Sequence, residues 1–282
     1  MKKMAYTKLN PRFTPGSRVK LISGESSHFL LSIPSGKADK YRLAQLDDYA
    51  ILPRWKFAHR TLTLSLSART SSNSIPGTWG FGLWNDPFGM SLGFGGRPFR
   101  VPALPNALWF FGSSKENYLS FRNPILPERS EAQRKGASTS GGATDDPPSA
   151  QRRGAVNGFI AQSFRAPKFH PLLILAGLTL PFSRKLTRQL MGRVIAEDGV
   201  NLSVDATQWH KYKFEWREER VVFEVDDAHL IESRVSPNPP LGLVIWIDNQ
   251  YAAFTPEGRI GFGVLENPEP AWLEVKDISV EN

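Results

Sequence analysis

The chain has 282 residues, of which 40% are hydrophobic and 11% aromatic, so it carries enough apolar surface for a large core. It has no cysteine, which excludes disulfide bonds, thiolate metal sites and cysteine nucleophiles. The formal net charge is +8, but the segment 128–195 holds eleven Lys/Arg against four Asp/Glu, and the remainder is nearly neutral. Because the basic character belongs to one segment, we expect no nucleic-acid partner.

The N-terminal stretch, residues 1–20, is basic and lacks the apolar core of a secretory signal. No apolar run reaches the roughly 20 residues that a membrane-spanning helix needs. The five histidines show no metal-ligand spacing, and the glycine-rich stretch 80–96 lacks the lysine of a phosphate-binding loop. We therefore expect a cytoplasmic protein without a signal peptide, a metal site or a cofactor.

In the first half of the chain, short apolar or alternating runs stand between turn residues, a pattern typical of β-strands. Trp79 and Trp84 differ in parity, so in a regular strand they face opposite sides of the sheet, and one of them is expected in the core. The runs predict strands at 28–34, 49–52, 62–68, 78–84, 107–112, 118–121 and 158–164.

Residues 127–157 consist mainly of Gly, Ser, Ala, Asp, Pro and Arg. Such a composition buries too little apolar surface to fold, so a disordered loop is predicted. Residues 168–199 are predicted as a basic amphipathic helical insertion. Pro171 is suited to open a first helix and Ser183 to cap a second one, which is expected to end at Asp198-Gly199.

The insertion has an apolar and a basic side, because Leu186, Leu190 and Val194 recur at helical spacing. Two interpretations remain open: the insertion lies on an anionic membrane surface, or it packs on the sandwich. The residues assigned to a membrane surface are Leu172, Leu173, Phe182, Arg184, Lys185 and Arg188.

Residues 209–227 predict a β-hairpin with an aromatic face. Aromatic residues share one parity in its first half, and charged residues share the other. A polar turn at 217–220 separates the two strands. The residues expected to face the interior or the concave side are Tyr212, Phe214, Trp216, Val221, Phe223 and Val225.

Four further runs predict strands at 241–247, 251–254, 259–265 and 271–280. Many short strands with a single helical region are typical of a sandwich or a barrel. We predict an all-β fold, a sandwich of two antiparallel sheets that forms one domain over residues 1–282.

Several segments, in this order, resemble the concanavalin A-like lectin/glucanase superfamily and, within it, glycoside hydrolase family 16. They are PGTWGFGLWND (76–86), WHKYKFEW with VVFEVDD (209–227), LGLVIWIDN (241–249) and WLEVKDISV (272–280). The resemblance covers roughly residues 45–125 and 200–282. It implies a jelly-roll sandwich whose concave face binds sugars.

The resemblance also implies a catalytic strand with a Glu-x-Asp-x-x-Glu pattern, shortly after the Gly-Thr-Trp strand. A retaining glycosidase needs two carboxyl groups ~5–5.5 Å apart. Here the sequence contains no Asp or Glu between Asp86 and Glu116. The chain therefore lacks the family's catalytic acidic motif, and we expect no family-16 hydrolysis.

Asp86 and Asp248 are the candidates for a displaced carboxylate pair, although both positions also suit strand-end turns. Tryptophan rings can stack on sugars, while amides and carboxylates bond to sugar hydroxyls. The predicted ligand-binding residues are Trp84, Asn85, Asp86, Trp246, Asp248 and Asn249.

Three functions follow from these observations. The preferred hypothesis is a glycan-recognition module with a carbohydrate partner and no hydrolytic activity. The second is a glycoside hydrolase or lyase with displaced carboxylates. The third is a peripheral membrane-associated protein that uses the sandwich as a scaffold.

Overall fold

The computed structural model describes residues 9–22, 27–49, 52–87, 103–121, 157–168, 171–172 and 178–281. The predicted loop at 127–157 lies outside the described residues except for Asn157, and Leu173 lies outside them as well.

Most strands belong to two seven-stranded antiparallel sheets, which confirms the predicted all-β sandwich. Sheet A contains, in spatial order, β1 (Asn10–Phe13), β4 (Leu43–Asp47), β13 (Gly242–Asp248), β6 (Thr78–Trp84), β7 (Ala107–Ser113), β8 (Gly158–Arg165) and β9 (Ala196–Asn201). Sheet B contains β12 (Ala228–Ser233), β11 (Val221–Val225), β10 (His210–Trp216), β5 (Leu62–Thr70), β16 (Ala271–Glu281), β3 (Phe29–Ile33) and β2 (Arg18–Leu21).

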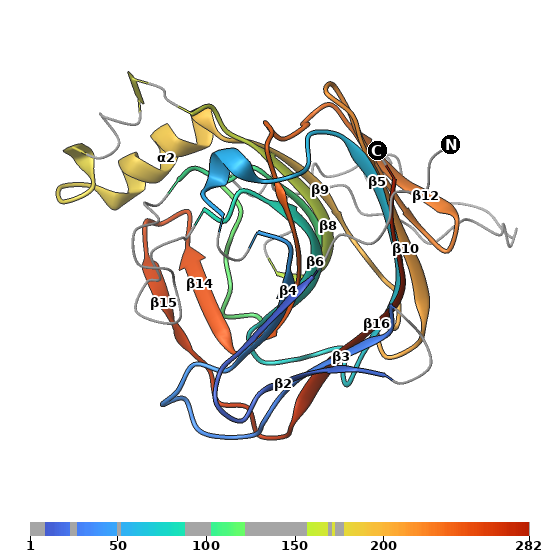
Figure 1. Cartoon of the computed structure of the whole chain (residues 1–282). Coiled ribbons are helices and arrows are strands. Elements are labelled where there is room, and N and C mark those ends of the chain that lie inside the picture. Colours follow the sequence, from blue (N-terminus) through green and yellow to red (C-terminus); the bar gives the residue numbers. More distant parts are fainter. Residues whose placement is uncertain are drawn as a thin grey trace, which may run out of the picture.

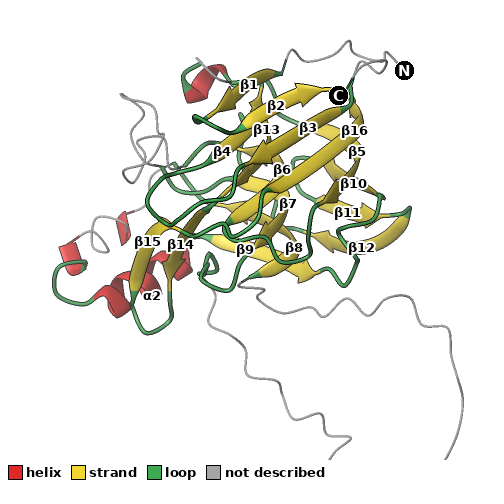
Figure 2. Cartoon of the chain, turned by 90° about the horizontal axis from the view of Figure 1, so that it is seen from below, coloured by secondary structure: helices red, strands yellow, loops and turns green. Residues whose placement is uncertain are grey.

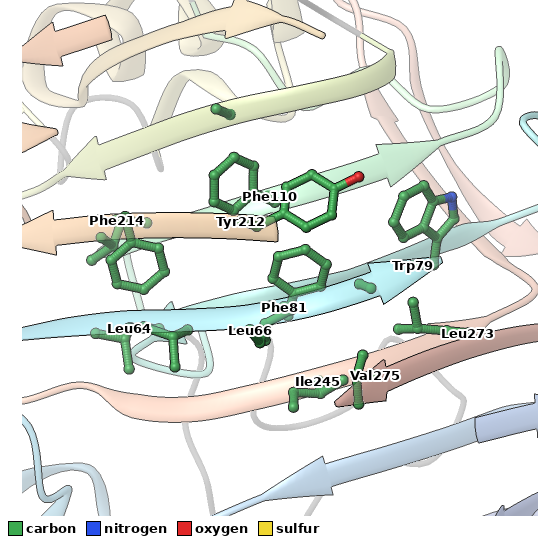
Figure 3. Packing of buried hydrophobic residues seen from close by; sticks show 14 of the residues in the cluster. Leu64, Leu66, Trp79, Phe81, Phe110, Tyr212, Phe214, Ile245, Leu273 and Val275 are labelled. Carbon is green, nitrogen blue, oxygen red and sulfur yellow. The ribbon is translucent and has the colours of Figure 1, made fainter. Parts of the chain in front are cut away.

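The main core lies between the two sheets, and strict alternation along the strands builds it. In β5, every second residue from Leu62 to Thr70 is buried, and its small polar residues lie on the other face. Phe81 of β6 and Phe110 of β7 contact Tyr212 of β10, each with ring centroids 5.1 Å apart (Figure 3). The aromatic rings of sheet A thus pack directly on those of sheet B.

The predicted β10–β11 hairpin is confirmed, together with its buried face. Phe214 pairs with Phe223, and the turn closes through a 2.9 Å bond from the Arg217 amide to the Arg220 carbonyl. All six residues predicted to face the interior are buried. Beyond it, Asp226 and Asp227 adopt positive φ angles of 51° and 62°, which aspartate tolerates, and they turn the chain into β12.

A third layer covers part of the outer face of sheet A, the face turned away from sheet B. It includes the 3₁₀ turn η1 (Arg54–Lys56), the helix α2 (Arg184–Val194), and the hairpin of β14 (Gln250–Phe254) and β15 (Ile260–Val264). Figure 1 shows sheet A between sheet B on one side and α2 with β14–β15 on the other. No helix in the described part of the chain is long and apolar enough to cross a bilayer.

Of the predicted strand 49–52, the structure describes only the two end residues, and neither belongs to a strand. Tyr49 lies beyond the end of β4 and packs against Phe57 and Trp84 on the outer face of sheet A. Tyr118 forms only an isolated bridge with Ala253. The predicted strand at 118–121 is therefore not found.

The helical insertion is shorter than predicted, because residues 196–201 form β9 and pair with β8. α2 begins after Ser183, whose hydroxyl accepts a 3.3 Å bond from the Leu186 amide, as the predicted cap requires. The predicted end at Asp198-Gly199 is wrong. Gly199 lets β8 approach closely, since a Cβ there would lie 2.7 Å from the Ala161 carbonyl oxygen.

Arg188 was predicted on the basic, exposed side of the insertion, but the structure buries it. It is only 1% exposed, and its guanidinium donates to the carbonyls of Phe254 and Ser120 at 2.8 Å each. Arg184 and Lys185 are exposed as predicted. Thus α2 packs on the body of the protein through one side, which holds Thr187, Arg188 and Leu190.

Candidate functional site

The residues of sheet A that face away from sheet B form a second buried cluster. In β7 they are Ala107, Trp109 and Phe111, and in β13 they are Val244 and Trp246. The other buried members of this cluster are Leu43, Tyr49, Phe57, Ile160, Phe164, Ala166 and Ile195. We call it the outer face of sheet A.

Two glycines in β6 make room for the tryptophans of the neighbouring strands. Gly80 pairs with Trp246, and Gly82 pairs with Trp109. A Cβ on Gly80 would lie 3.0 Å from Cη2 of Trp246, and one on Gly82 would lie 2.6 Å from Cβ of Trp109. The glycines of TWGFGLW therefore let the backbone of β7 and the tryptophans of both neighbouring strands approach β6 closely.

Trp84 and Trp246 are parallel on this face, with ring centroids 6.1 Å apart and an interplanar angle of 4°. Trp246 is 6% exposed, while Trp84 is half-buried and donates from Nε1 to the Tyr49 hydroxyl at 2.5 Å. Trp79 faces the main core instead. This confirms that Trp79 and Trp84 lie on opposite faces of β6.

Asp248 lies at the end of β13, in the same row as Thr78 of β6. Its carboxylate accepts from the Thr78 hydroxyl at 2.7 Å, from the Tyr41 hydroxyl at 3.1 Å and from the Gln250 amide at 3.2 Å. Burial raises the pKa of Asp248 to about 6, against the opposing effect of these hydrogen bonds. Trp246 joins the group, since its Nε1 donates to the Thr78 hydroxyl at 2.9 Å.

Asp86 belongs to the loop after β6 and has a positive φ of 47°. The Arg54 guanidinium holds this loop through the carbonyls of Asn85 and Asp86, at 2.7 and 2.5 Å. The pKa of Tyr41 is raised well above its usual value by burial first, then by the charge of Asp248, and also by that of Asp86. The negative charges of both predicted carboxylates, Asp248 and Asp86, therefore raise the pKa of the same tyrosine.

Several polar residues of this site were not predicted. Asp47 of β4 is fully buried, with Arg12 of β1 at 3.6 Å and the Gln45 amide donating to it at 2.9 Å. Burial and the charges of Asp86 and Asp47 raise the pKa of Tyr49 well above its usual value. No sequence signal points to Asp47, because its partners come from other strands or from positions that read as ordinary polar residues.

Asn85 and Asn249 hold backbone segments. The Asn85 amide donates to the Leu104 carbonyl at 2.9 Å, and its oxygen accepts from the Asn106 amide at 3.1 Å. Asn249 is fully buried and bonds the backbone of residues 40, 42 and 265. The polar atoms of both side chains thus fix the loops around the site, so a direct contact with a ligand is better sought at Trp84 and Asp86.

Comparison with solved structures finds similar architectures among glucan-degrading enzymes, while no family model and no curated protein matches the sequence. LamAcat from Zobellia galactanivorans aligns with a TM-score of 0.46 and 12% identity, covering 98% of this chain and 91% of that one. A glycoside hydrolase family 16 endo-glucanase from Bacteroides ovatus gives 0.44 and 8%, covering 98% and 96%.

The laminarinase catalytic domain from Thermotoga maritima aligns with a TM-score of 0.42 and 11% identity, covering 93% of this chain and 79% of that one. These likenesses describe architecture alone. The function of this chain depends on the chemistry of its own residues.

Proposed function

We propose that the outer face of sheet A binds a carbohydrate and does not carry out family-16 hydrolysis. The observation that carries the proposal is the half-buried indole of Trp84, parallel to Trp246 and next to partly exposed polar side chains. The apolar face of a sugar ring packs on such an indole. Arg12, Tyr41 and Asp86 are partly exposed around it and supply donors and acceptors for hydroxyl groups.

The composition of β7 supports binding without hydrolysis. β7 is the antiparallel neighbour of β6, which begins within the Gly-Thr-Trp sequence. The family resemblance implies the catalytic carboxylates on the strand after it, which is β7. Its residues on the outer face are Ala107, Trp109 and Phe111, none of which can act as an acid, a base or a nucleophile at a sugar. A retaining mechanism needs two carboxyl groups ~5–5.5 Å apart, and β7 offers none.

The second candidate is a glycoside hydrolase or lyase with displaced carboxylates, which the state of Asp248 favours. A carboxyl group with a pKa of about 6 holds its proton near neutral pH more readily than an ordinary aspartate, as a general acid must. Asp86 would then supply the second carboxylate. The hydrogen bonds from Thr78 and Tyr41 to Asp248 are equally compatible with a purely structural role.

A binding assay with mixed-linkage and β-1,3-glucans tests the proposal. Trp84→Ala should weaken binding by about tenfold or more, because the stacking surface is lost. Trp272→Ala is the matched control, since Trp272 is also half-buried but belongs to β16 of sheet B. Circular dichroism verifies that both variants stay folded. Equal binding by the wild type and Trp84→Ala would contradict the proposed site.

The same glucans, assayed for new reducing ends, separate the two candidates. We expect no turnover. Turnover that disappears in Asp248→Asn or Asp86→Asn would make the displaced-carboxylate enzyme the correct function.

A further inference from the structure

We propose that the segment 178–194 and the β14–β15 hairpin form one docking surface for an anionic lipid bilayer. None of its residues belongs to the proposed carbohydrate site around Trp84. Besides the predicted insertion, the surface includes a hairpin that is distant in sequence. Arg188 is not part of the surface, because its guanidinium bonds to backbone carbonyls inside the protein.

Two contacts join the two segments into one body. The Arg188 guanidinium of α2 donates to the Phe254 carbonyl, at the end of β14, at 2.8 Å. The loop that follows touches the start of the helix, since a Cβ on Gly258 would lie 2.6 Å from the Lys185 amide nitrogen. Figures 1 and 2 both draw α2 beside β14–β15, projecting from the sandwich. The two segments therefore adjoin and form one continuous body.

Large apolar side chains are exposed on both segments. Phe182 is 89% exposed, the highest value among the large hydrophobic residues that the structure describes. On the helical side it is accompanied by Leu178, Leu180 and Leu186, and on β15 by Ile260 and Phe262, each more than 40% exposed. Such a concentration of exposed apolar residues marks an interaction surface in a folded protein.

The charges near these residues favour an anionic partner. Arg184, Lys185 and Arg193 are exposed on α2, and the Arg259 side chain between β14 and β15 is 81% exposed. Segment 178–194 contains no Asp or Glu, and residues 254–264 contain only Glu257, which pairs with Arg259 at 4.0 Å. Exposed apolar side chains next to basic ones suit the boundary between the anionic head groups and the acyl chains of a bilayer.

The dimensions determine the orientation. α2 has 11 residues and is therefore about 16 Å long, roughly half of a ~30 Å hydrocarbon core. The helix is also fixed to the protein along its Arg188 side. We infer that it lies along the membrane plane, with Phe182 and its neighbours in the interface and the basic side chains at the head groups.

Co-sedimentation of the full chain with vesicles tests the proposal. The wild type should bind vesicles of phosphatidylcholine with phosphatidylserine much more tightly than vesicles of phosphatidylcholine alone. Phe182→Ser should weaken binding to the anionic vesicles about tenfold or more, since an exposed phenyl ring is lost. The double variant Arg184→Gln/Lys185→Gln should weaken it about 25-fold, at about fivefold for each basic residue.

Two control variants carry the same chemical changes elsewhere. Phe13→Ser removes a phenylalanine that is 57% exposed in β1, which Figure 2 shows at the opposite end of the molecule from α2. Arg217→Gln/Arg220→Gln removes two charges between β10 and β11, which Figure 2 shows across the molecule from α2. Both controls should bind anionic vesicles like the wild type.

Three results would overturn the proposal. The first is a wild type that does not bind anionic vesicles. The second is an equal loss of binding in the control variants, which would indicate general charge or stickiness. The third is a wild-type dimer in solution that Phe182→Ser dissociates, since a second copy of the chain would then cover this surface. Glucan binding by the Phe182 variant stays a separate measurement, so the two proposals stand or fall independently.

Discussion

Phe214 lies in the middle of β10 and is 1% exposed, with its ring centroid 6.0 Å from that of Phe223. Replacement by alanine removes this ring and leaves a cavity between the sheets. We expect Phe214→Ala to lower the free energy of unfolding by about 3–5 kcal/mol. Urea denaturation measures the change.

Lys213 gives the matched control for Phe214, because it is the adjacent residue on the outer face of sheet B. It forms a partly exposed ion pair with Glu224 at 2.8 Å. Lys213→Ala should cost less than about 1 kcal/mol. If both variants lose the same stability, β10 does not bury its aromatic face as described.

Asp248 gives the stability of the fold a specific pH dependence. Its pKa is raised to about 6 in the folded state by burial, against an ordinary value of 3.8. Between these two values the folded state holds the proton more tightly than the unfolded state. Protonated Asp248 therefore stabilises the folded state fully below pH 3.8, and this stabilisation is lost as the pH rises to about 6. The free energy of unfolding should fall over this range by an amount on the order of 3 kcal/mol.

The variant Asp248→Asn isolates this effect, since an amide keeps similar hydrogen-bonding capacity without the titration. The stability of the wild type relative to the variant should decrease from pH 4 to pH 6, and then stay constant above that range. Urea denaturation at several pH values follows this difference. A difference that is independent of pH would show that Asp248 does not titrate in this window.

At the level of elements, Arg188 holds α2 on the body of the protein through two carbonyl groups. Arg188→Met keeps much of the side-chain volume but leaves the carbonyls of Phe254 and Ser120 without these donors. We expect stability to fall by about 1–3 kcal/mol, and the amides of α2 to exchange hydrogen faster. Hydrogen exchange measured by mass spectrometry follows the helix directly.

Arg193→Met is the control for Arg188→Met, because it makes the same substitution in the same helix at an exposed position. It should change neither stability nor exchange by a measurable amount. Equal exchange in the two variants would mean that Arg188 does not anchor the helix.

At the level of the whole molecule, the main core connects sheet A and sheet B through aromatic contacts such as that between Phe110 and Tyr212. Neither sheet can keep its buried face from water without the other. We therefore predict one cooperative unfolding transition. Far-UV circular dichroism follows the sheets, and tryptophan fluorescence also follows the outer face of sheet A. Two separate transitions, or a predominantly helical spectrum, would contradict a single cooperative sandwich.

The strands that the sequence predicted best are those with strict alternation. The run 78–84 matches β6 in both bounds, and the parity of Trp79 and Trp84 correctly placed them on opposite faces. The strands β1, β2, β4, β9 and β12 were missed. β9 carries the sequence AEDGVN, and its place depends on pairing with β8, a contact that no local pattern contains.

The candidate site was predictable only in part, for a related reason. Trp84, Trp246 and the two aspartates are visible in the sequence as aromatic or acidic residues at strand ends. Arg12 and Asp47 meet only because β1 pairs with β4, and Asn249 fills its hydrogen bonds with backbone groups more than two hundred residues away at Lys40 and Arg42.

The sequence by itself determined the all-β class and the inward faces of the main strands, because alternation has a period of two residues and is read locally. Only the tertiary structure decided which polar residues are buried. Arg188 shows the reason: its sequence pattern is that of a solvent-exposed helix face, yet its carbonyl partners lie 66 and 68 residues away. A buried charge depends on such distant partners, and they come together only when the chain folds.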